Sequence, residues 1–168
     1  NIVIVELKQW QKAEVVADDM HYCVKTFIAN SDRIVCHPSY QAYSYSCFLK
    51  NYSQSLTDES INLVPCAYLH NYQPEYRQTL SNPIYKEWFE VAPFFIKNEV
   101  AVFSDFVKKY ITKKSSKGDL LYLIDHGRLR PTKALQDSLA SMVKGNKEFM
   151  LLDEQAVCFD MCLKTMSQ

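Results

Sequence analysis

Short apolar runs and longer apolar stripes alternate along the chain and predict a succession of strands and helices. The first eight residues are β-branched and apolar on both faces, which is typical of a central strand covered on both sides. Turn-prone Asn30-Ser31-Asp32 separates the next two strand-like pieces. Together these runs predict strands at residues 1–8, 26–28, 33–36, 62–68, 120–124 and 149–152.

Helices are predicted where apolar residues recur every three or four positions. The first follows His37-Pro38, because proline suits the first helical turn. Its apolar stripe is Tyr45, Phe48, Leu49, Tyr52 and Leu56. The predicted helices span residues 39–55, 100–111 and 131–142, and a last one begins at Asp153. The proline- and aromatic-rich segment 71–93 is predicted to be irregular but well packed. This order predicts an α/β fold with a mixed central sheet flanked by helices.

The composition is close to that of an average globular protein. The 168 residues carry 19 Lys and Arg against 19 Asp and Glu, and 48% of them are hydrophobic. This balance excludes a disordered tail, and no apolar run reaches the roughly 18 residues that a membrane helix needs. Six cysteines are present without a Cys-x-x-Cys pair, and most lie among apolar neighbours. We therefore expect buried, reduced thiols and a cytoplasmic protein that does not contact a membrane.

Glu6 and Lys8 are the first candidates for chemistry. Side chains alternate across a strand, so both project from one face near the end of the first strand. A carboxylate can ligate Mg²⁺, and a neighbouring lysine can stabilise charge on a phosphate. Alone, this pair is more commonly an ordinary ion pair at a strand end. Gln41 and Tyr45 lie one turn apart at the start of the first helix, so we expect them to face the same cleft.

A longer ordered set of motifs resembles a known family. The chain is similar to the N-terminal region of bacterial and archaeal Schlafen-like DNA/RNA helicase proteins, a family whose domain has no assigned function. The resemblance covers nearly the whole chain, through motifs that are each weak but occur in a specific order. They are Ile4-Val5-Glu6-Leu7-Lys8-Gln9-Trp10, His37-Pro38-Ser39 with Gln41 and Tyr45, Cys66-Ala67-Tyr68-Leu69-His70-Asn71-Tyr72, Ala92-Pro93, Lys117-Gly118-Asp119, Arg130-Pro131 with Lys133, and Gly145-Asn146.

The resemblance implies a restriction-endonuclease-like, PD-(D/E)XK core that lacks its N-terminal part. It implies that Glu6 ligates a metal, that Lys8 stabilises charge, and that Gln41 and Tyr45 match a Q-x-x-x-Y helix of the same nucleases. Gln155 then lies just before a helicase domain, where such a glutamine reads adenine. The implied division is a nuclease-like core at 1–112 and an extension toward the helicase at 113–168. The implied partners are DNA or RNA and the helicase domain of the same chain, with a homodimer as a further option.

Two departures limit what this chain is expected to do alone. The nuclease motif needs an aspartate upstream of Glu6, and no G-x-x-x-x-G-K-[ST] loop for ATP occurs in the sequence. The chain also starts within a predicted strand and without methionine, so we expect a piece of a larger protein. Mg²⁺ is therefore expected in the intact parent and only weakly in this piece, which is expected to be inactive alone. The alternatives are a non-catalytic nucleic-acid or protein docking module and a structural adaptor.

Basic residues are concentrated in the second half of the chain. Residues 105–133 hold eight Lys or Arg against three Asp, a local net charge of +5. A solvated face is the ordinary explanation, and a phosphate-contacting strip is the functional one. The candidate nucleic-acid contacts are Lys113, Lys114, Lys117, Arg128, Arg130 and Lys133. They bracket the strand predicted at 120–124, whose ends would lie about 17 Å apart, so one backbone could touch both groups.

This strip generates a salt-dependence prediction. We expect weak binding to single-stranded or duplex nucleic acid that fades between about 50 and 200 mM salt, because phosphate contacts release counterions. Replacing Lys113, Lys114, Arg128 and Arg130 with Ser should flatten the slope of log affinity against log salt, measured by fluorescence anisotropy. An unchanged slope in the quadruple variant would mean that the strip is only a solvated face.

Overall fold

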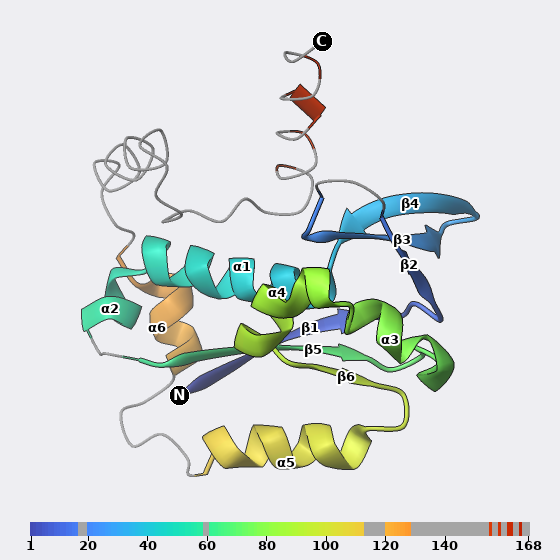
Figure 1. Cartoon of the computed structure of the whole chain (residues 1–168). Helices are drawn as coiled ribbons and strands as arrows, with labels where there is room; N and C mark the ends of the chain where they lie inside the picture. Colours follow the sequence, from blue (N-terminus) through green and yellow to red (C-terminus); the bar gives the residue numbers. More distant parts are fainter. Residues whose placement is uncertain are drawn as a thin grey trace.

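A parallel sheet forms the centre of the part of the chain that is described. The computed structural model describes residues 1–16, 20–58, 61–112 and 120–128, together with Gln155, Cys158, Met161, Cys162 and Thr165. Strands β1 (Ile2–Lys8), β5 (Leu63–Leu69) and β6 (Phe94–Ile96) pair in parallel in the order β1-β5-β6 (Figure 1). The predicted strands at 1–8 and 62–68 are therefore confirmed.

The predicted central position of β1 is wrong for the described sheet. β1 is at its edge, and the residues of this strand other than Leu7 are half-buried, whereas Leu7 is exposed. β5 occupies the centre instead and carries Pro65 in its interior. Proline is tolerated there because β6 pairs only with residues Ala67 to Leu69, so the position of Pro65 has no described strand on that side.

A second, antiparallel sheet extends from one end of the first (Figure 1). It contains β2 (Ala13–Val15), β3 (Cys23–Ile28) and β4 (Ser31–Cys36), in that order. The two predicted strand pieces are confirmed and are longer than expected. The turn between β3 and β4 is made by Ala29 and Asn30, whose φ angles are 50° and 62°, as a tight two-residue hairpin turn requires.

Helix α1 (Pro38–Tyr52) covers the parallel sheet, followed by the short helix α2 (Gln54–Asp58). The helix was expected, but its predicted apolar stripe holds only in part, because Leu56 is buried whereas Phe48 is exposed and small residues are buried as well. Ser44 and Ser46 are buried with their hydroxyls bonded to the carbonyls three residues earlier, at 2.8 and 2.7 Å. These two serines let the helix pack closely against its neighbours while their own hydroxyls stay paired.

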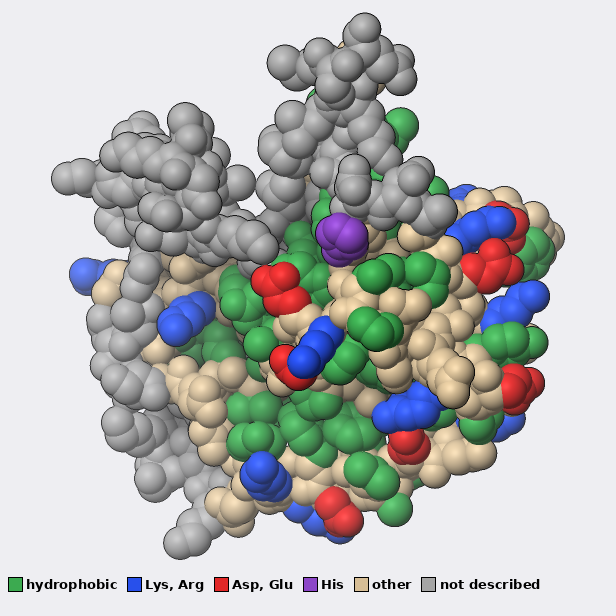
Figure 2. Space-filling view, viewed as in Figure 1, with side chains coloured by type: hydrophobic (Ala, Val, Ile, Leu, Met, Phe, Trp, Pro, Cys, Tyr) green, Lys and Arg blue, Asp and Glu red, His purple; other side chains and the backbone are tan. Residues whose placement is uncertain are grey.

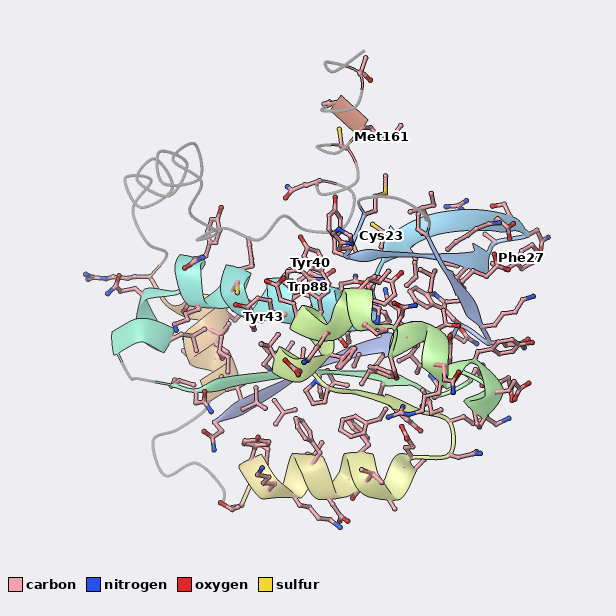
Figure 3. The ribbon with its side chains drawn as sticks, in the orientation of Figure 1. Cys23, Phe27, Tyr40, Tyr43, Trp88 and Met161 are labelled. Carbon is pink, nitrogen blue, oxygen red and sulfur yellow. The ribbon has the colours of Figure 1, made fainter. Side chains whose placement is uncertain are left out.

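The proline-rich segment was expected to be irregular and is instead largely helical. It contains the 3₁₀ turns η1 (Pro74–Tyr76) and η2 (Pro83–Tyr85) and the helices α3 (Arg77–Leu80) and α4 (Lys86–Val91). Each 3₁₀ turn begins at its proline. Proline costs no hydrogen bond there, because the first N–H groups of a helix have no partner within the helix. α4 lies beside α1 on the same face of the sheet, and Tyr40, Tyr43 and Trp88 gather between them (Figure 3).

Helix α5 (Val100–Tyr110) confirms the helix predicted at 100–111, and it covers the opposite face of the sheet (Figure 1). Phe103 stacks on Tyr68 of β5 at 4.8 Å between ring centroids and also contacts Phe95 of β6. The predicted strand at 120–124 is wrong, because Leu120–His126 forms helix α6. Such a short apolar run has no clear period, and its leucines favour a helix. The basic groups at 113–117 and 128–133 therefore flank a helix, and the 17 Å spacing argument no longer applies.

Other predicted elements lie outside the described residues, namely the helix at 131–142, the strand at 149–152 and the start of the last helix. None of the helices in the described part is both long and apolar enough to cross a membrane.

A buried histidine joins the two sheets to the helical segment. His37 follows β4, caps α1 by accepting the Ser39 N–H at Nδ1 (3.2 Å), and places Nε2 3.1 Å from the carbonyl of Leu80. Its ring stacks on Tyr85 at 4.6 Å. Because Nδ1 accepts, Nε2 carries the proton, and the imidazole is neutral. Burial lowers the pKa of His37 to about 4.

This buried imidazole predicts acid sensitivity. In the unfolded chain His37 takes up a proton near its ordinary pKa of 6.5, whereas in the folded chain it does so only near 4. The free energy of unfolding should therefore be constant above about pH 7 and fall by up to about 3 kcal/mol as the pH drops toward 4. Urea unfolding at a series of pH values measures this slope. His37→Gln should be less stable at pH 7 and lose much of the slope, and the exposed-site control His70→Gln should keep it.

Candidate functional site

The register of the parallel sheet places Glu6 and Lys8 on the face that α1 and α4 cover. Glu6 pairs with Ala67, and Lys8 pairs with Leu69. Paired residues of neighbouring strands point to the same face. Ala67 and Leu69 belong to one buried cluster with Tyr40 of α1 and Trp88 of α4. The expectation that the Glu6-Lys8 pair and the first helix share a side of the sheet is therefore met.

The two charged side chains form an ion pair at the carboxyl end of β1. Lys8 Nζ is 2.9 Å from a carboxylate oxygen of Glu6, and their side chains are only 16% and 15% exposed. The same ammonium lies 5.1 Å from the centre of the Trp10 ring, which is buried in the core. Low exposure and the contact with the Trp10 ring therefore restrict the positions that this ion pair can adopt, unlike those of an exposed surface pair.

Gln41 and Tyr45 lie together near the start of α1. The Gln41 side-chain amide donates to the Tyr45 hydroxyl at 3.2 Å, and Gln41 is buried. Tyr40 and Tyr43 use a different flank of the helix to pack on Trp88. Gln41 and Tyr45 therefore occupy a flank of α1 that faces away from α4.

Arg128, another predicted site residue, does not join this group. Arg128 is exposed, and its carbonyl accepts the Gln54 N–H at 3.0 Å, so it lies beside α2 at the far end of α1. Figure 1 shows α2 and α6 at the end of the sheet opposite the hairpin. Gln155 is exposed. The remaining basic candidates fall outside the described residues: Lys113, Lys114, Lys117, Arg130 and Lys133.

A cavity of about 830 Å³ opens beside the carboxyl end of β1. Lys8 and Trp10 line it together with Lys25 and Phe27 of β3 and Asn71, which follows β5. The carboxyl ends of parallel strands are where open α/β sheets bind ligands. The hairpin's part in this site was missed at the sequence level, because nothing local in 23–36 indicates that the strands fold back beside Lys8.

The cavity is lined by a connecting loop that the rest of the fold holds in place. The carbonyl of Gln11 accepts the Gln73 N–H at 2.9 Å, and the carbonyl of Lys12 accepts the Thr26 hydroxyl at 2.7 Å. Trp10 anchors the start of the same loop in the core. The cavity is therefore formed before any ligand arrives, as is usual for binding sites.

Charges around the cavity are largely balanced. Lys25 lies 2.8 Å from Asp32 and 3.7 Å from Glu14, across both neighbouring strands. The hydrogen bond to Asp32 is the main reason that the pKa of Lys25 is raised. Figure 2 likewise shows basic and acidic side chains next to one another at the hairpin end of the molecule. The site is therefore not a strongly positive groove.

The side chains at the end of β1 do not complete a Mg²⁺ site. Among the described residues, no three His, Cys, Asp or Glu side chains are grouped so that they could hold a metal ion. Glu6 offers a single carboxylate, which Lys8 already engages. Mg²⁺ gives up its water reluctantly and is usually held by carboxylates together with substrate phosphates. We therefore derive no catalytic step through a metal from this set of residues.

Comparison of this chain with protein-family models, with curated proteins and with solved structures finds no match.

Proposed function

We propose that this chain is a nuclease-like module of a nucleic-acid-processing protein, and that the end of β1 holds a phosphodiester of DNA or RNA. The observation that carries the proposal is the half-buried Glu6-Lys8 pair on the α1 side of the sheet, next to a preformed cavity. An ammonium has three N–H donors, so Lys8 can bond Glu6 and a phosphate oxygen at once. Its restricted exposure strengthens that bond relative to one in water.

Each residue has a role in this proposal. Lys8 binds the phosphate and stabilises charge that develops on it, and Gln41 positions the substrate from the α1 side. Tyr45 orients Gln41 through the hydrogen bond between their side chains. Phosphodiester hydrolysis belongs to the intact parent, in which further carboxylates would join Glu6 as ligands for Mg²⁺, and the helicase domain implied by the resemblance would deliver the strand.

A docking module that binds nucleic acid without cleaving it is the second candidate. The engagement of the single carboxylate Glu6 by Lys8, at 2.9 Å, favours it for the chain by itself. Binding and cleavage therefore have to be measured separately.

The proposal predicts that one lysine matters far more than its neighbours. Lys8→Met should weaken binding of a fluorescein-labelled 20-nucleotide strand about tenfold, because it removes a charge-assisted hydrogen bond in a sheltered position. Lys86→Met is the matched control, since Lys86 is 66% exposed and lies on α4. Anisotropy titrations at low salt measure both. Equal losses in the two variants, or no binding by the unmutated chain, would contradict the proposed site.

Glu6→Gln separates the two candidate functions in the same assay. Removing its negative charge should leave binding equal or tighter, because the carboxylate repels phosphate. Incubation with Mg²⁺ or Mn²⁺, analysed on denaturing gels, then shows whether the unmutated chain cleaves the strand and whether Glu6→Gln abolishes cleavage. Cleavage that depends on Glu6 supports the nuclease and would overturn the expectation that this chain is inactive alone, and binding without cleavage favours the docking module for the chain by itself. Calorimetric Mg²⁺ titration should give only weak binding.

A further inference from the structure

We propose that the cavity beside Lys8 accepts an unpaired base of a single-stranded nucleic acid. This inference rests on the proposed phosphate site and specifies its substrate class. A volume of about 830 Å³ is within the range of small-molecule sites and is ample for a base with its sugar. The cavity adjoins Lys8, so a base inside it would have its own phosphate within reach of that ammonium.

The lining of the cavity suits a neutral, planar, hydrogen-bonding group. Three lysines line it, Lys8, Lys12 and Lys25, against the acidic residues Glu14 and Asp32, and Lys8 and Lys25 are paired with carboxylates, so the cavity carries only a small excess of the positive charge that a polyphosphate would favour. Three of its lining residues carry amide side chains: Gln9, Gln11 and Asn71. Amides present a donor and an acceptor side by side, which is the pattern that base edges match.

Phe27 supplies an aromatic surface at the same cavity. It lines the cavity, yet the residue is 58% exposed, near the turn end of the hairpin (Figure 3). Its cross-strand partner is Asp32, so the residue directly opposite offers the ring no apolar side chain to pack on. Exposed aromatic rings beside basic side chains are what single-strand binding proteins use to stack bases.

The same features favour a single strand over a duplex. In a duplex the bases are stacked on one another and their edges are paired, so a base reaches a side pocket only after it is unstacked and unpaired, at a cost of a few kcal/mol. A single strand offers its bases without that cost. We therefore expect the chain to prefer single-stranded over duplex nucleic acid of the same sequence.

Phe27→Ala tests the stacking role. It should weaken binding of a 20-nucleotide single strand about five- to a hundredfold, the range for loss of one stacked base. Ile34→Ala is the matched control, because Ile34 is 45% exposed on the neighbouring strand β4 and does not line the cavity. Binding is measured by anisotropy with labelled single strands and with unlabelled duplex as competitor.

The outcomes separate this inference from the function on which it rests. A loss in Phe27→Ala with an unchanged Ile34→Ala, together with weak competition by duplex, supports the base site. If Lys8→Met weakens binding but Phe27→Ala does not, the phosphate site stands and the base site is wrong. Equal competition by duplex also overturns the base site. If no strand binds at all, both proposals fail together, and thermal denaturation of each variant shows whether it is folded.

A different observation carries a second inference, about two cysteines that face each other across the hairpin. Cys23 of β3 and Cys36 of β4 are direct partners, and they are 0% and 2% exposed. Opposed residues alternate between hydrogen-bonded and non-hydrogen-bonded pairs, and the next pair outward, Tyr22 and His37, is hydrogen-bonded at 2.7 Å. Cys23 and Cys36 are therefore a non-hydrogen-bonded pair, the closer kind.

We infer that Cys23 and Cys36 form a cross-strand disulfide when the protein meets a small disulfide oxidant. Cα atoms of such a pair lie about 4.5 Å apart, inside the range that a disulfide spans. One thiolate attacks oxidised glutathione and releases one glutathione thiol. The second thiol then attacks the mixed disulfide and releases the other, so two protons and two electrons pass to glutathione. The bond would tie the end of β4, and with it the His37 cap, to β3.

Oxidation of the purified chain tests this pair. After incubation with oxidised glutathione and alkylation, peptide mass mapping should show a Cys23–Cys36 cross-link, and the oxidised protein should unfold at a higher urea concentration. The stability gain should vanish in Cys36→Ser. Cys66→Ser is the control, since Cys66 is buried in β5 opposite Val5 and burial raises the pKa of its thiol to about 12. Glutathione adducts on both cysteines, or both thiols still reduced after incubation in mild urea, would overturn the inference.

Discussion

The arrangement of this molecule depends on one neutral imidazole buried where three segments meet. His37 ends the hairpin, caps α1, contacts the Leu80 carbonyl and stacks on Tyr85. Both ring nitrogens are used in ways that only the neutral form allows, one as acceptor and one as donor. A helix whose first turn is tied in this way cannot rotate about its axis without breaking the cap, so the faces that it presents to the sheet are fixed.

Other contacts reinforce the same junction. The Tyr85 hydroxyl donates to the Cys23 carbonyl at 2.7 Å, and the Trp88 indole donates to the His21 carbonyl at 2.9 Å. The segment that links β5 to β6 is therefore hydrogen-bonded to the start of β3 through two aromatic side chains. Each of them buries its ring while its polar group has a partner. Because the same segment covers the sheet, the hairpin and the carboxyl end of β1 are held in one arrangement, and the cavity between them is part of the fold.

The candidate site combines features that, taken singly, do not indicate a function. A half-buried ion pair, an amide cluster and an exposed phenylalanine are common in proteins, and a solvated or structural role is the ordinary explanation for each. They indicate a binding site because they occur together at the carboxyl end of a parallel strand, beside a cavity of ligand size. The balanced charges there argue for recognition through stacking and hydrogen bonds with a single phosphate contact, rather than for attraction of a polyanion by net charge.

The sequence by itself determined the elements that have a strong local signal. The β-branched run of β1 and the proline start of α1 predicted those elements. Alternation of side chains along β1 was enough to put Glu6 and Lys8 on one face, and the register then confirmed it. The reason is physical, because period, proline geometry and strand alternation are properties of neighbouring residues.

Only the tertiary structure decided how those elements meet. The helical nature of 74–91 depends on aromatic anchors such as Tyr85 and Trp88, whose partners are more than 60 residues away in sequence. The run 120–126 has no period to separate strand from helix, and its packing against α2 was not visible in it. Ser44 is buried and Phe48, one turn further along the same side of α1, is exposed, a difference that the period of the helix alone does not predict. Likewise, the cavity exists because the hairpin folds back beside Lys8. The position of the hairpin relative to β1 is not predicted by any local pattern in the sequence.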